Sequence, residues 1–190
     1  YELRLTSVPV AQRPVIDKVV EVDLEIMLHL ATLAERHIEE LAFHRPVKIV
    51  EEFAHTIEKE MNYILEADSM ERAAGQFIND PHVYMPKVYR ELSTRKILTI
   101  EFINGIKVSE KKKLLDAGLD CRLITERGAD VLLKQIFSHG FFHADPHPGN
   151  IFVLPRNVIC LIDFGMMGAV DRSTREIFVK LVDALIRRDD

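Results

Sequence analysis

The sequence is poor in cysteine and contains no long apolar run. Its two cysteines, Cys121 and Cys160, lie far apart in unlike contexts, which gives neither a disulfide framework nor a zinc knuckle. A reducing compartment is therefore expected. No stretch of about 18 uncharged apolar residues occurs and no signal peptide is recognisable, so the sequence predicts neither a membrane span nor a secretory leader.

A dominant stripe of basic residues is also missing. The net charge is −5 and the lysine run from Lys111 to Lys113 is short, so nucleic acid is not expected as a partner. What is present is the balance of an ordinary globular protein, with 47% apolar and 29% charged residues. The 190 residues suit one domain or most of one. Because the first residues resemble the middle of a strand and the last ones stop inside a helical pattern, we expect a fragment of a longer protein.

The apolar spacing predicts a chain of helices and strands. Its period is helical from Ile16 to about Phe43, and again from Pro46 until the pattern fades near Gln76. β-Forming residues and turn signals follow. The expected elements are a strand remnant over 1–11 interrupted at Pro9, the two long helices, short strands within 83–89, a strand over 96–102, helices over 108–117 and 121–138 with Gly140 as C-terminal cap, strands over 151–154 and 158–162, and a final helix over 171–188.

The densest set of reactive residues lies around the last two strands. His143-Ala144-Asp145 opens a loop that closes at Asn150, and Asp163-Phe164-Gly165 follows the second strand. This order matches the H-x-D-x-x-x-x-N and D-F-G motifs of kinases. There the first aspartate orients the acceptor and takes its proton, while the asparagine and second aspartate hold Mg²⁺ against the phosphates. The 13 positions from Asn150 to Asp163 fit a short hairpin, which would bring them together.

A metal-dependent hydrolase is the rival interpretation of this loop. His139, His143 and His147 recur every four positions, and histidines with a carboxylate can bind zinc or iron. That spacing aligns side chains only on a continuous helix, however, and the glycine and prolines of the loop break one. We therefore expect that the histidines share no metal, that His143 shapes the loop by bonding to the backbone, and that His139 lies near a helix end.

Glu66 is the second point of interest. It lies on the helix that also carries Glu60 and Asn62, and kinases use one helix glutamate to pair with a strand lysine that grips the phosphates. A solvated acidic face is the alternative for any single glutamate of this helix.

These motifs are similar to those of the UbiB atypical kinase family, also called the AarF family, along essentially all 190 residues. The most specific stretches are 142–150 and 161–168, with support from 12–14, 23–24 and 60–67. The resemblance implies an α+β, helix-rich, protein-kinase-like fold truncated at both ends. Residues 1–103 would form a partial N-lobe with long helices and the hinge strand, and residues 104–190 a partial C-lobe with the catalytic loop.

The resemblance also implies roles for single residues. Asp145 would be catalytic, and Asn150 and Asp163 would be the metal ligands. Glu66 would pair with the strand lysine, and Glu60 and Asn62 would correspond to an E-x-D signature that holds an inhibitory extension. An edge strand over 98–102 would be the hinge, where backbone groups from Glu101 to Ile103 reach adenine.

Three positions depart from the family pattern. Val10 stands where the strand lysine is expected, Val15 replaces a glycine, and Asn62 replaces the aspartate of E-x-D. The family's K-x-G-Q motif and alanine-rich nucleotide loop do not occur in these 190 residues, and any such segments would lie upstream of residue 1.

The resulting hypothesis is an atypical kinase or ATPase that binds ATP and Mg²⁺ and supports isoprenoid quinone (ubiquinone) biosynthesis. The expected partners are the nucleotide, a quinone-precursor lipid or quinone-biosynthesis proteins, and a membrane surface. The expected location is cytoplasmic with peripheral membrane association, or mitochondrial or plastid in a eukaryote. Two alternatives stay open: a small-molecule kinase of the aminoglycoside or choline type, and a non-catalytic pseudokinase or lipid-binding regulator, which Val10 favours.

Overall fold

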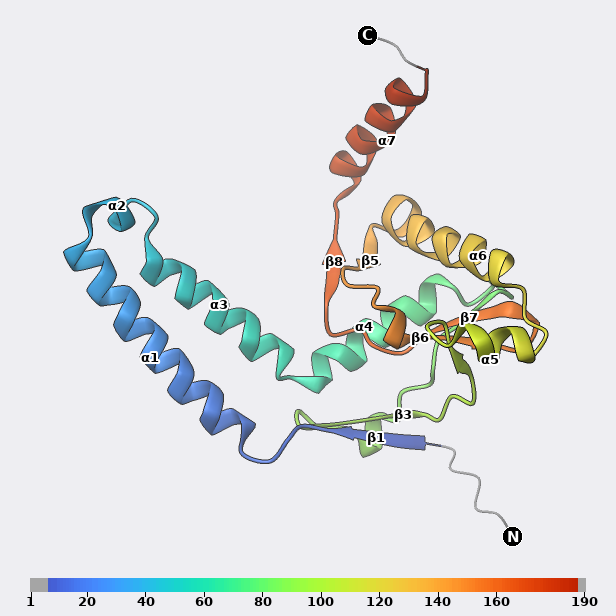
Figure 1. Cartoon of the computed structure of the whole chain (residues 1–190), viewed down its shortest axis with the longest axis horizontal. Coiled ribbons are helices and arrows are strands. Elements are labelled where there is room, and N and C mark those ends of the chain that lie inside the picture. Colours follow the sequence, from blue (N-terminus) through green and yellow to red (C-terminus); the bar gives the residue numbers. More distant parts are fainter. Residues whose placement is uncertain (1–6, 188–190) are drawn as a thin grey trace.

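In the computed structural model, which describes residues 7–187, a mixed helical and stranded body carries two projections (Figure 1). Helices α1 (Ile16–His37) and α3 (Pro46–Glu60) lie side by side and form an arm, with the short α2 (Glu39–Ala42) at its tip. Helix α7 (Arg172–Arg187) is the second projection, which continues from the end of β8 and lies apart from the arm. Within the described range, no helix has the length and hydrophobicity needed to cross a membrane.

The strands form three small sheets. Strands β1 (Ser7–Ala11) and β3 (Ile97–Glu101) pair antiparallel, and β5 (Phe141–His143) pairs antiparallel with β8 (Met167–Ala169). The third sheet has the order β2-β7-β6-β4. Its members are β2 (Val83–Tyr84), β7 (Val158–Leu161), β6 (Ile151–Leu154) and β4 (Ile106–Lys107).

The core lies where α4 (Tyr63–Gln76) meets β3 and the hairpin formed by β6 and β7. Helix α4 buries Ala67, Met70 and Ala73, and β3 buries Leu98 and Ile100. The hairpin strands, α5 (Lys111–Asp116) and α6 (Cys121–Leu133) complete the same cluster of buried residues. The remaining short helical turns are 90–92, 148–150 and 155–157.

The first strand is continuous through Pro9, contrary to the predicted interruption. Pro9 lies opposite Thr99 of β3. The carbonyl of Thr99 accepts a hydrogen bond from Tyr89 and its N–H donates to the Ser93 hydroxyl, so both backbone groups point away from β1. A proline costs no ladder hydrogen bond at such a position. Strand β3 lies in a two-stranded sheet, which agrees with the predicted edge strand, and it ends at Glu101. Isolated bridges from Val88 and Thr94 are its other strand-like contacts among the described residues.

The predicted long helices are each broken. The first ends at His37 and leaves the four-residue α2, and the second divides into α3 and α4. Asn62 causes the second break, because its extended backbone and its side chain, which accepts a hydrogen bond from Ile64 N–H at 3.2 Å, start a new helix. Pro46, in contrast, opens α3 as predicted.

Asn62→Ala should lower the free energy of unfolding by about 0.5–2 kcal/mol, because it leaves an N–H of the first turn of α4 without its acceptor. Urea denaturation followed by circular dichroism measures this change. Asn62→Ser, which keeps a capping oxygen, is the matched control and should lose much less. Equal losses for alanine and serine would show that the cap does not stabilise α4.

Val15 adopts a left-handed backbone with φ 68° at the start of α1. A β-branched residue in this region is strained, whereas glycine adopts it freely. The family resemblance leads us to expect a glycine at this position, and glycine would adopt this backbone conformation without strain. In this chain Val15 adopts it instead, and its backbone is strained.

Helix α6 continues into a π-helical segment, Lys134–His139, and ends at Gly140 with φ 66°, the predicted glycine cap.

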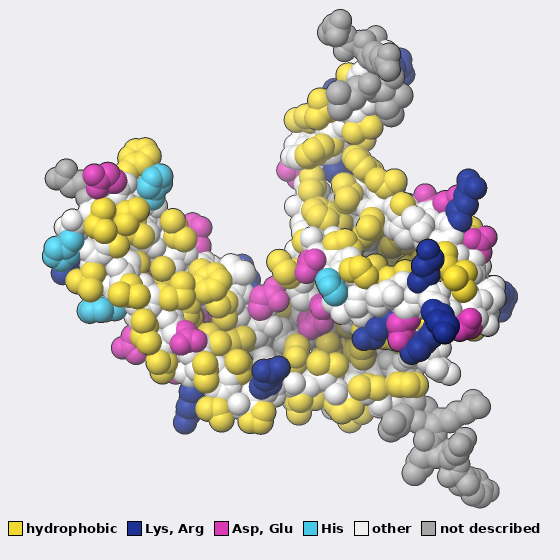
Figure 2. Space-filling model, in the orientation of Figure 1, with side chains coloured by type: hydrophobic (Ala, Val, Ile, Leu, Met, Phe, Trp, Pro, Cys, Tyr) yellow, Lys and Arg dark blue, Asp and Glu magenta, His cyan; other side chains and the backbone are white. Residues whose placement is uncertain are grey.

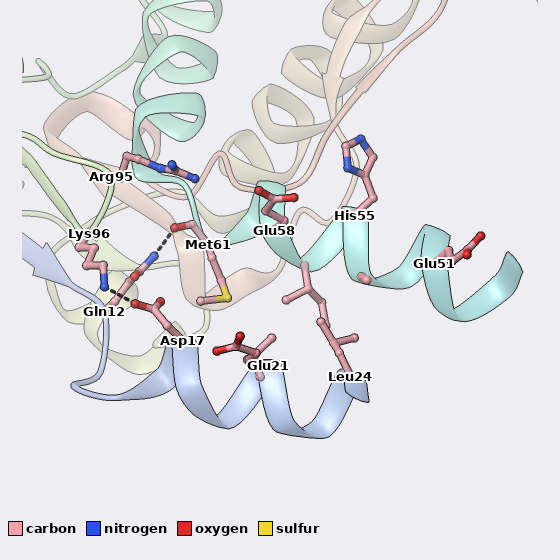
Figure 3. Close-up of a pocket in the computed structure, with 13 residues that line it drawn as sticks. Gln12, Asp17, Glu21, Leu24, Glu51, His55, Glu58, Met61, Arg95 and Lys96 are labelled. Atoms are coloured by element: carbon pink, nitrogen blue, oxygen red, sulfur yellow. Dashed lines mark hydrogen bonds and ion pairs between the residues drawn. The ribbon is translucent and has the colours of Figure 1, made fainter. Parts of the chain in front are cut away.

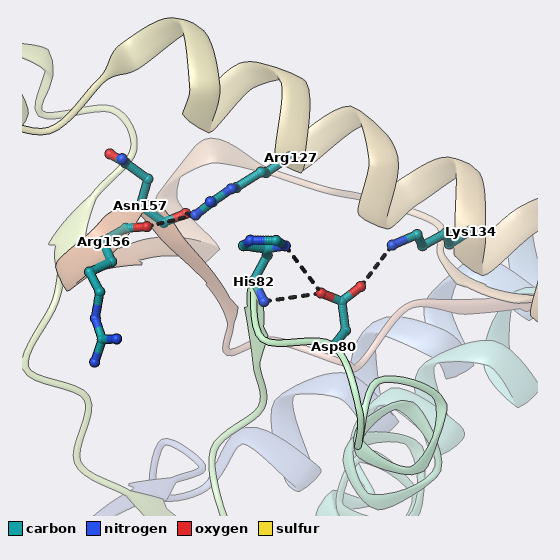
Figure 4. A network of polar contacts seen from close by, with 6 residues as sticks. All are labelled: Asp80, His82, Arg127, Lys134, Arg156 and Asn157. Atoms are coloured by element: carbon teal, nitrogen blue, oxygen red, sulfur yellow. Dashed lines mark hydrogen bonds and ion pairs between the residues drawn. The ribbon is translucent and has the colours of Figure 1, made fainter.

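A polar network joins this helix to the segment before β2 (Figure 4). Lys134 Nζ contacts Asp80 Oδ2 at 2.7 Å and holds the pKa of that carboxyl below its usual value. Arg127 donates to the carbonyl oxygens of Arg156 and Asn157 at 2.6 Å each, which fixes the hairpin turn on α6.

Candidate functional site

The hairpin β6–β7 brings two predicted site residues into contact. Ile151 pairs with Leu161, and Ile162 N–H donates to the Asn150 carbonyl at 3.1 Å. As a result, Asn150 Nδ2 lies 2.7 Å from Asp163 Oδ2. The other carboxylate oxygen, Asp163 Oδ1, accepts a hydrogen bond from Gly165 N–H at 3.1 Å. The spacing of 13 positions therefore gives the hairpin and the contact that the sequence predicted.

Strands β5 and β8 place the loop that carries Asp145 against the same segment. His143 pairs with Met167, and Ala144 N–H donates to the Met166 carbonyl at 2.9 Å. Asp145 follows with an exposed side chain, and its carbonyl accepts a hydrogen bond from His147 N–H at 2.7 Å. The backbone therefore turns directly after Asp145 and leads to Asn150.

His143 is buried and contacts both the loop that carries Asp145 and the Asp163-Phe164-Gly165 segment. Its Nδ1 accepts the Asp145 N–H at 3.2 Å, which confirms the predicted role in shaping the loop. Its ring lies 5.9 Å from that of Phe164, which is fully buried. Burial lowers the pKa of His143, while Asp163, through its charge and a backbone hydrogen bond, and Asp145 oppose this shift. The neutral imidazole that results can accept the Asp145 N–H.

The other two histidines have different surroundings. His147 Nδ1 accepts the Gly149 N–H at 3.0 Å, and the His139 ring packs on Phe77 with centroids 5.5 Å apart. Among residues 7–187, no group of three or more histidine, cysteine or acidic side chains is arranged to hold a metal ion.

Glu66 lies on α4, after the break, rather than on a second long helix. Its Oε1 accepts the Phe164 N–H at 3.3 Å, so it contacts the backbone next to Asp163. Glu60, from the end of α3, also reaches this segment, since its Oε2 would lie 3.2 Å from a Cβ added to Gly165. Neither glutamate forms an ion pair within the part of the chain that the structure describes.

The three carboxylates affect one another. Burial is the main reason why the pKa of Glu66 rises to about 7, and the charges of Asp163 and Glu60 add to it, while the Phe164 hydrogen bond opposes it. Burial and then Asp163 also raise the pKa of Glu60. The cluster therefore concentrates negative charge beside Asn150.

Glu66→Gln should raise the free energy of unfolding at pH 8 by about 1–2 kcal/mol without Mg²⁺. The folded pKa of about 7 lies above the ordinary 4.5, so this proton-linked stability is complete below about pH 4.5 and is lost as the pH rises through about 7. Glutamine keeps an acceptor for Phe164 N–H but cannot ionise. Urea denaturation at pH 4.5 and pH 8 measures the difference.

Glu71→Gln is the control, because Glu71 lies on the same helix but pairs with Arg90, whose Nη2 is 2.7 Å from Glu71 Oε2. This variant should gain nothing at pH 8. A loss of stability in Glu66→Gln at pH 8 would mean that a cation partners Glu66 in solution.

The remaining predicted residues are placed as follows. Val10 lies in β1 opposite Leu98, so no strand lysine is present there. Glu101 ends β3 with its N–H donated to the Lys87 carbonyl at 2.8 Å and its carboxylate bound by the Tyr84 hydroxyl at 2.6 Å. Ile103 follows β3, outside any helix or strand.

The sequence did not indicate a role for Gln135. This residue is fully buried, and its side chain accepts a hydrogen bond from the His143 N–H at 3.2 Å. The helical pattern around Gln135 gave no signal of this burial.

Comparison with known proteins agrees with this geometry. The ABC1 atypical kinase-like domain matches residues 8–190. A probable protein kinase UbiB of Aeromonas hydrophila is 36% identical over 181 residues, covering 93% of this chain and 33% of the relative. Another from Aliivibrio fischeri is 39% identical over 167 residues, covering 86% and 31%. The chain thus spans about a third of the length of these relatives.

A solved structure shows the same fold. The Mycobacterium tuberculosis protein Rv3197, determined in complex with erythromycin, superposes with a TM-score of 0.67 at 25% identity, covering 86% of this chain and 40% of that one. The α+β, kinase-like fold expected from the motifs is therefore confirmed. The family match over nearly the whole chain and the motifs at the hairpin lead to one conclusion: the chain belongs to the ABC1 atypical kinase-like family, which includes proteins named UbiB.

Proposed function

We propose that the full-length protein binds ATP with Mg²⁺ and transfers or hydrolyses the γ-phosphoryl group. The observation that supports this most is the contact of Asn150 with Asp163 at the end of the hairpin. Asn150 donates through Nδ2, which leaves its amide oxygen available, and Asp163 adds carboxylate oxygens. Such oxygens are the ligands that Mg²⁺ prefers, and the neighbouring Glu60 and Glu66 favour a cation here.

In this proposal Asn150 and Asp163 hold Mg²⁺, which would neutralise charge on the phosphates when bound. Asp145, exposed and next to the His143 turn, accepts the proton of the acceptor hydroxyl or water. Ile103 would contribute backbone groups to adenine. The Glu101 N–H already bonds to Lys87, so the adenine contact at Glu101 would need another of its groups.

We assign Glu66 a positioning role, because it holds the Phe164 N–H next to Asp163. Glu60 and Asn62 would be regulatory, since both lie where α3 meets α4, between the arm and the site. Residues 1–103 and 104–190 would correspond to the partial N-lobe and C-lobe.

The substrate class comes from the family resemblance. We propose that the full-length protein supports isoprenoid quinone biosynthesis at a membrane surface, with a quinone-precursor lipid or quinone-biosynthesis proteins as partners. It would be cytoplasmic and peripheral, or mitochondrial or plastid in a eukaryote.

A Mg²⁺-dependent rise in the melting temperature with ATP, together with phosphate release, tests this proposal on the full-length protein. Vesicles with and without a polyprenylated phenol test the lipid part separately. ATP binding that does not depend on Mg²⁺ would contradict the proposed site.

A non-catalytic regulator is the second candidate, and Val10 favours it because the phosphate-gripping lysine is missing from β1. Binding of Mg²⁺-ATP without phosphate release, with or without the vesicles, would support this candidate.

A further inference from the structure

The loop that carries Asp145 is held by buried polar groups. Asp145 itself is exposed, and acidic side chains gather on the surface between the arm and the body (Figure 2). An exposed carboxylate that takes a proton needs a fixed loop, because a small misplacement of a reacting group costs much of the rate. The buried polar side chains of the described residues are those of Thr99, Gln135 and His143, and the Gln135 side chain bonds to the His143 backbone.

A cavity of about 820 Å³ between α1 and α3 has no part in holding this loop (Figure 3). Its carboxylates are Asp17, Glu21, Glu51 and Glu58, and neither Asp145 nor any other residue of its loop lines it. The groups that fix the loop therefore lie on β5 and on the helix before it.

Strand β5 has one edge on β8 and a second edge that faces away from it. On the β8 side, the Gly140 carbonyl accepts the Val170 N–H at 2.8 Å. Backbone groups alternate between the two edges of a strand, so those of Phe141 and His143 point away from β8. This second edge is open to bonds from side chains.

Two glutamines bond to the second edge of β5. Gln76 of α4 donates through Nε2 to the Phe141 carbonyl at 3.3 Å, and Gln135 Oε1 accepts the His143 N–H at 3.2 Å. The Gln135 bond leads on to Asp145, because His143 Nδ1 in turn accepts the Asp145 N–H at 3.2 Å. The contacts therefore run from the π-helical segment through His143 to Asp145.

Stability alone does not explain an amide at position 135. The Gln135 side chain is fully buried, and its Nε2 has no hydrogen-bond partner among the described residues. A buried donor without an acceptor is destabilising, and a methionine of similar size would fill the space without that cost. Gln135 also lies in a π-helical turn, a rare conformation that is frequent at functional sites.

We propose that Gln135 is a positioning residue for Asp145. By accepting the His143 N–H it fixes the residue whose ring holds the turn at Asp145. This inference rests on the proposed phosphoryl transfer, in which Asp145 accepts the proton.

Gln135→Met in the full-length protein should lower kcat for phosphate release by about tenfold or more, because the His143 N–H loses its acceptor and the Asp145 turn shifts. Mg²⁺-dependent ATP binding should stay within about twofold, since the Asn150–Asp163 contact does not involve Gln135. Gln135→Glu keeps an acceptor oxygen in nearly the same shape and should stay within about threefold of the unmodified kcat. Single-turnover phosphate release and ATP-dependent melting shifts measure the two quantities.

Gln76→Met is the matched control, because the same substitution on the same edge of β5 removes the bond to Phe141 and leaves the acceptor of His143 in place. It should lower kcat by less than about threefold. Circular dichroism verifies that each variant is folded. Equal loss of kcat in the two methionine variants would show that the glutamines merely stabilise the strand and would overturn the proposal. A Gln135→Glu protein as slow as Gln135→Met would overturn it as well.

Hydrogen exchange followed by mass spectrometry tests the contact without ATP. In peptides that span residues 141–147, the amides of His143 and Asp145 should exchange about tenfold faster in Gln135→Met and at nearly the unmodified rate in Gln135→Glu. Unchanged exchange in Gln135→Met would contradict the positioning role. If the unmodified protein releases no phosphate, the proposed function fails, and the exchange result alone decides whether Gln135 holds the loop.

Discussion

Asp145→Asn in the full-length protein should reduce phosphate release by about 10²–10⁴-fold, the usual contribution of a general base. Mg²⁺-dependent ATP binding should stay within about twofold, because the Asp145 side chain is exposed and separate from the Asn150–Asp163 contact. Asparagine has nearly the same shape but cannot take the proton. Single-turnover phosphate release and ATP-dependent melting shifts measure the two quantities.

Asp116→Asn is the matched control, since Asp116 is an exposed aspartate at the end of α5, and it should leave both quantities unchanged. Unchanged turnover in Asp145→Asn would remove Asp145 from the proton transfer. Loss of binding together with turnover would place Asp145 among the metal or nucleotide contacts instead.

Asp163→Asn should weaken Mg²⁺-dependent ATP binding by about 100-fold or more, because the substitution removes the one full charge among the two proposed ligands. The fold should be retained, since an asparagine oxygen can still accept the Gly165 N–H that Asp163 Oδ1 now accepts at 3.1 Å. Isothermal titration calorimetry with and without Mg²⁺ measures the effect.

Asn150→Asp serves as a second variant because it keeps oxygen ligands, and it should weaken binding less than Asp163→Asn. It also loses the donor of the 2.7 Å hydrogen bond and places two carboxylates together, so its affinity should depend more strongly on Mg²⁺ concentration. Metal-independent binding that Asp163→Asn leaves intact would reject the metal assignment.

Local patterns account for the parts of the fold that could be predicted. The strands of the hairpin were predicted within one residue, because β-forming residues alternate with clear turn signals there. Gly140 was predicted as a cap because glycine tolerates the left-handed conformation that ends a helix. The long helices were predicted in type but not in extent. Apolar periodicity continues across residues 61–62, and a side-chain cap interrupts a helix without changing that periodicity.

The sequence by itself determined the family, the hairpin and the contact of Asn150 with Asp163, because strand pairing over a short loop brings the two positions together. Only the tertiary structure decided that Glu66 bonds to the backbone of Phe164, 98 positions away, and that Glu60 approaches Gly165. Periodicity shows which positions are apolar, but the packing of distant elements determines which of them are covered and which charged groups become neighbours.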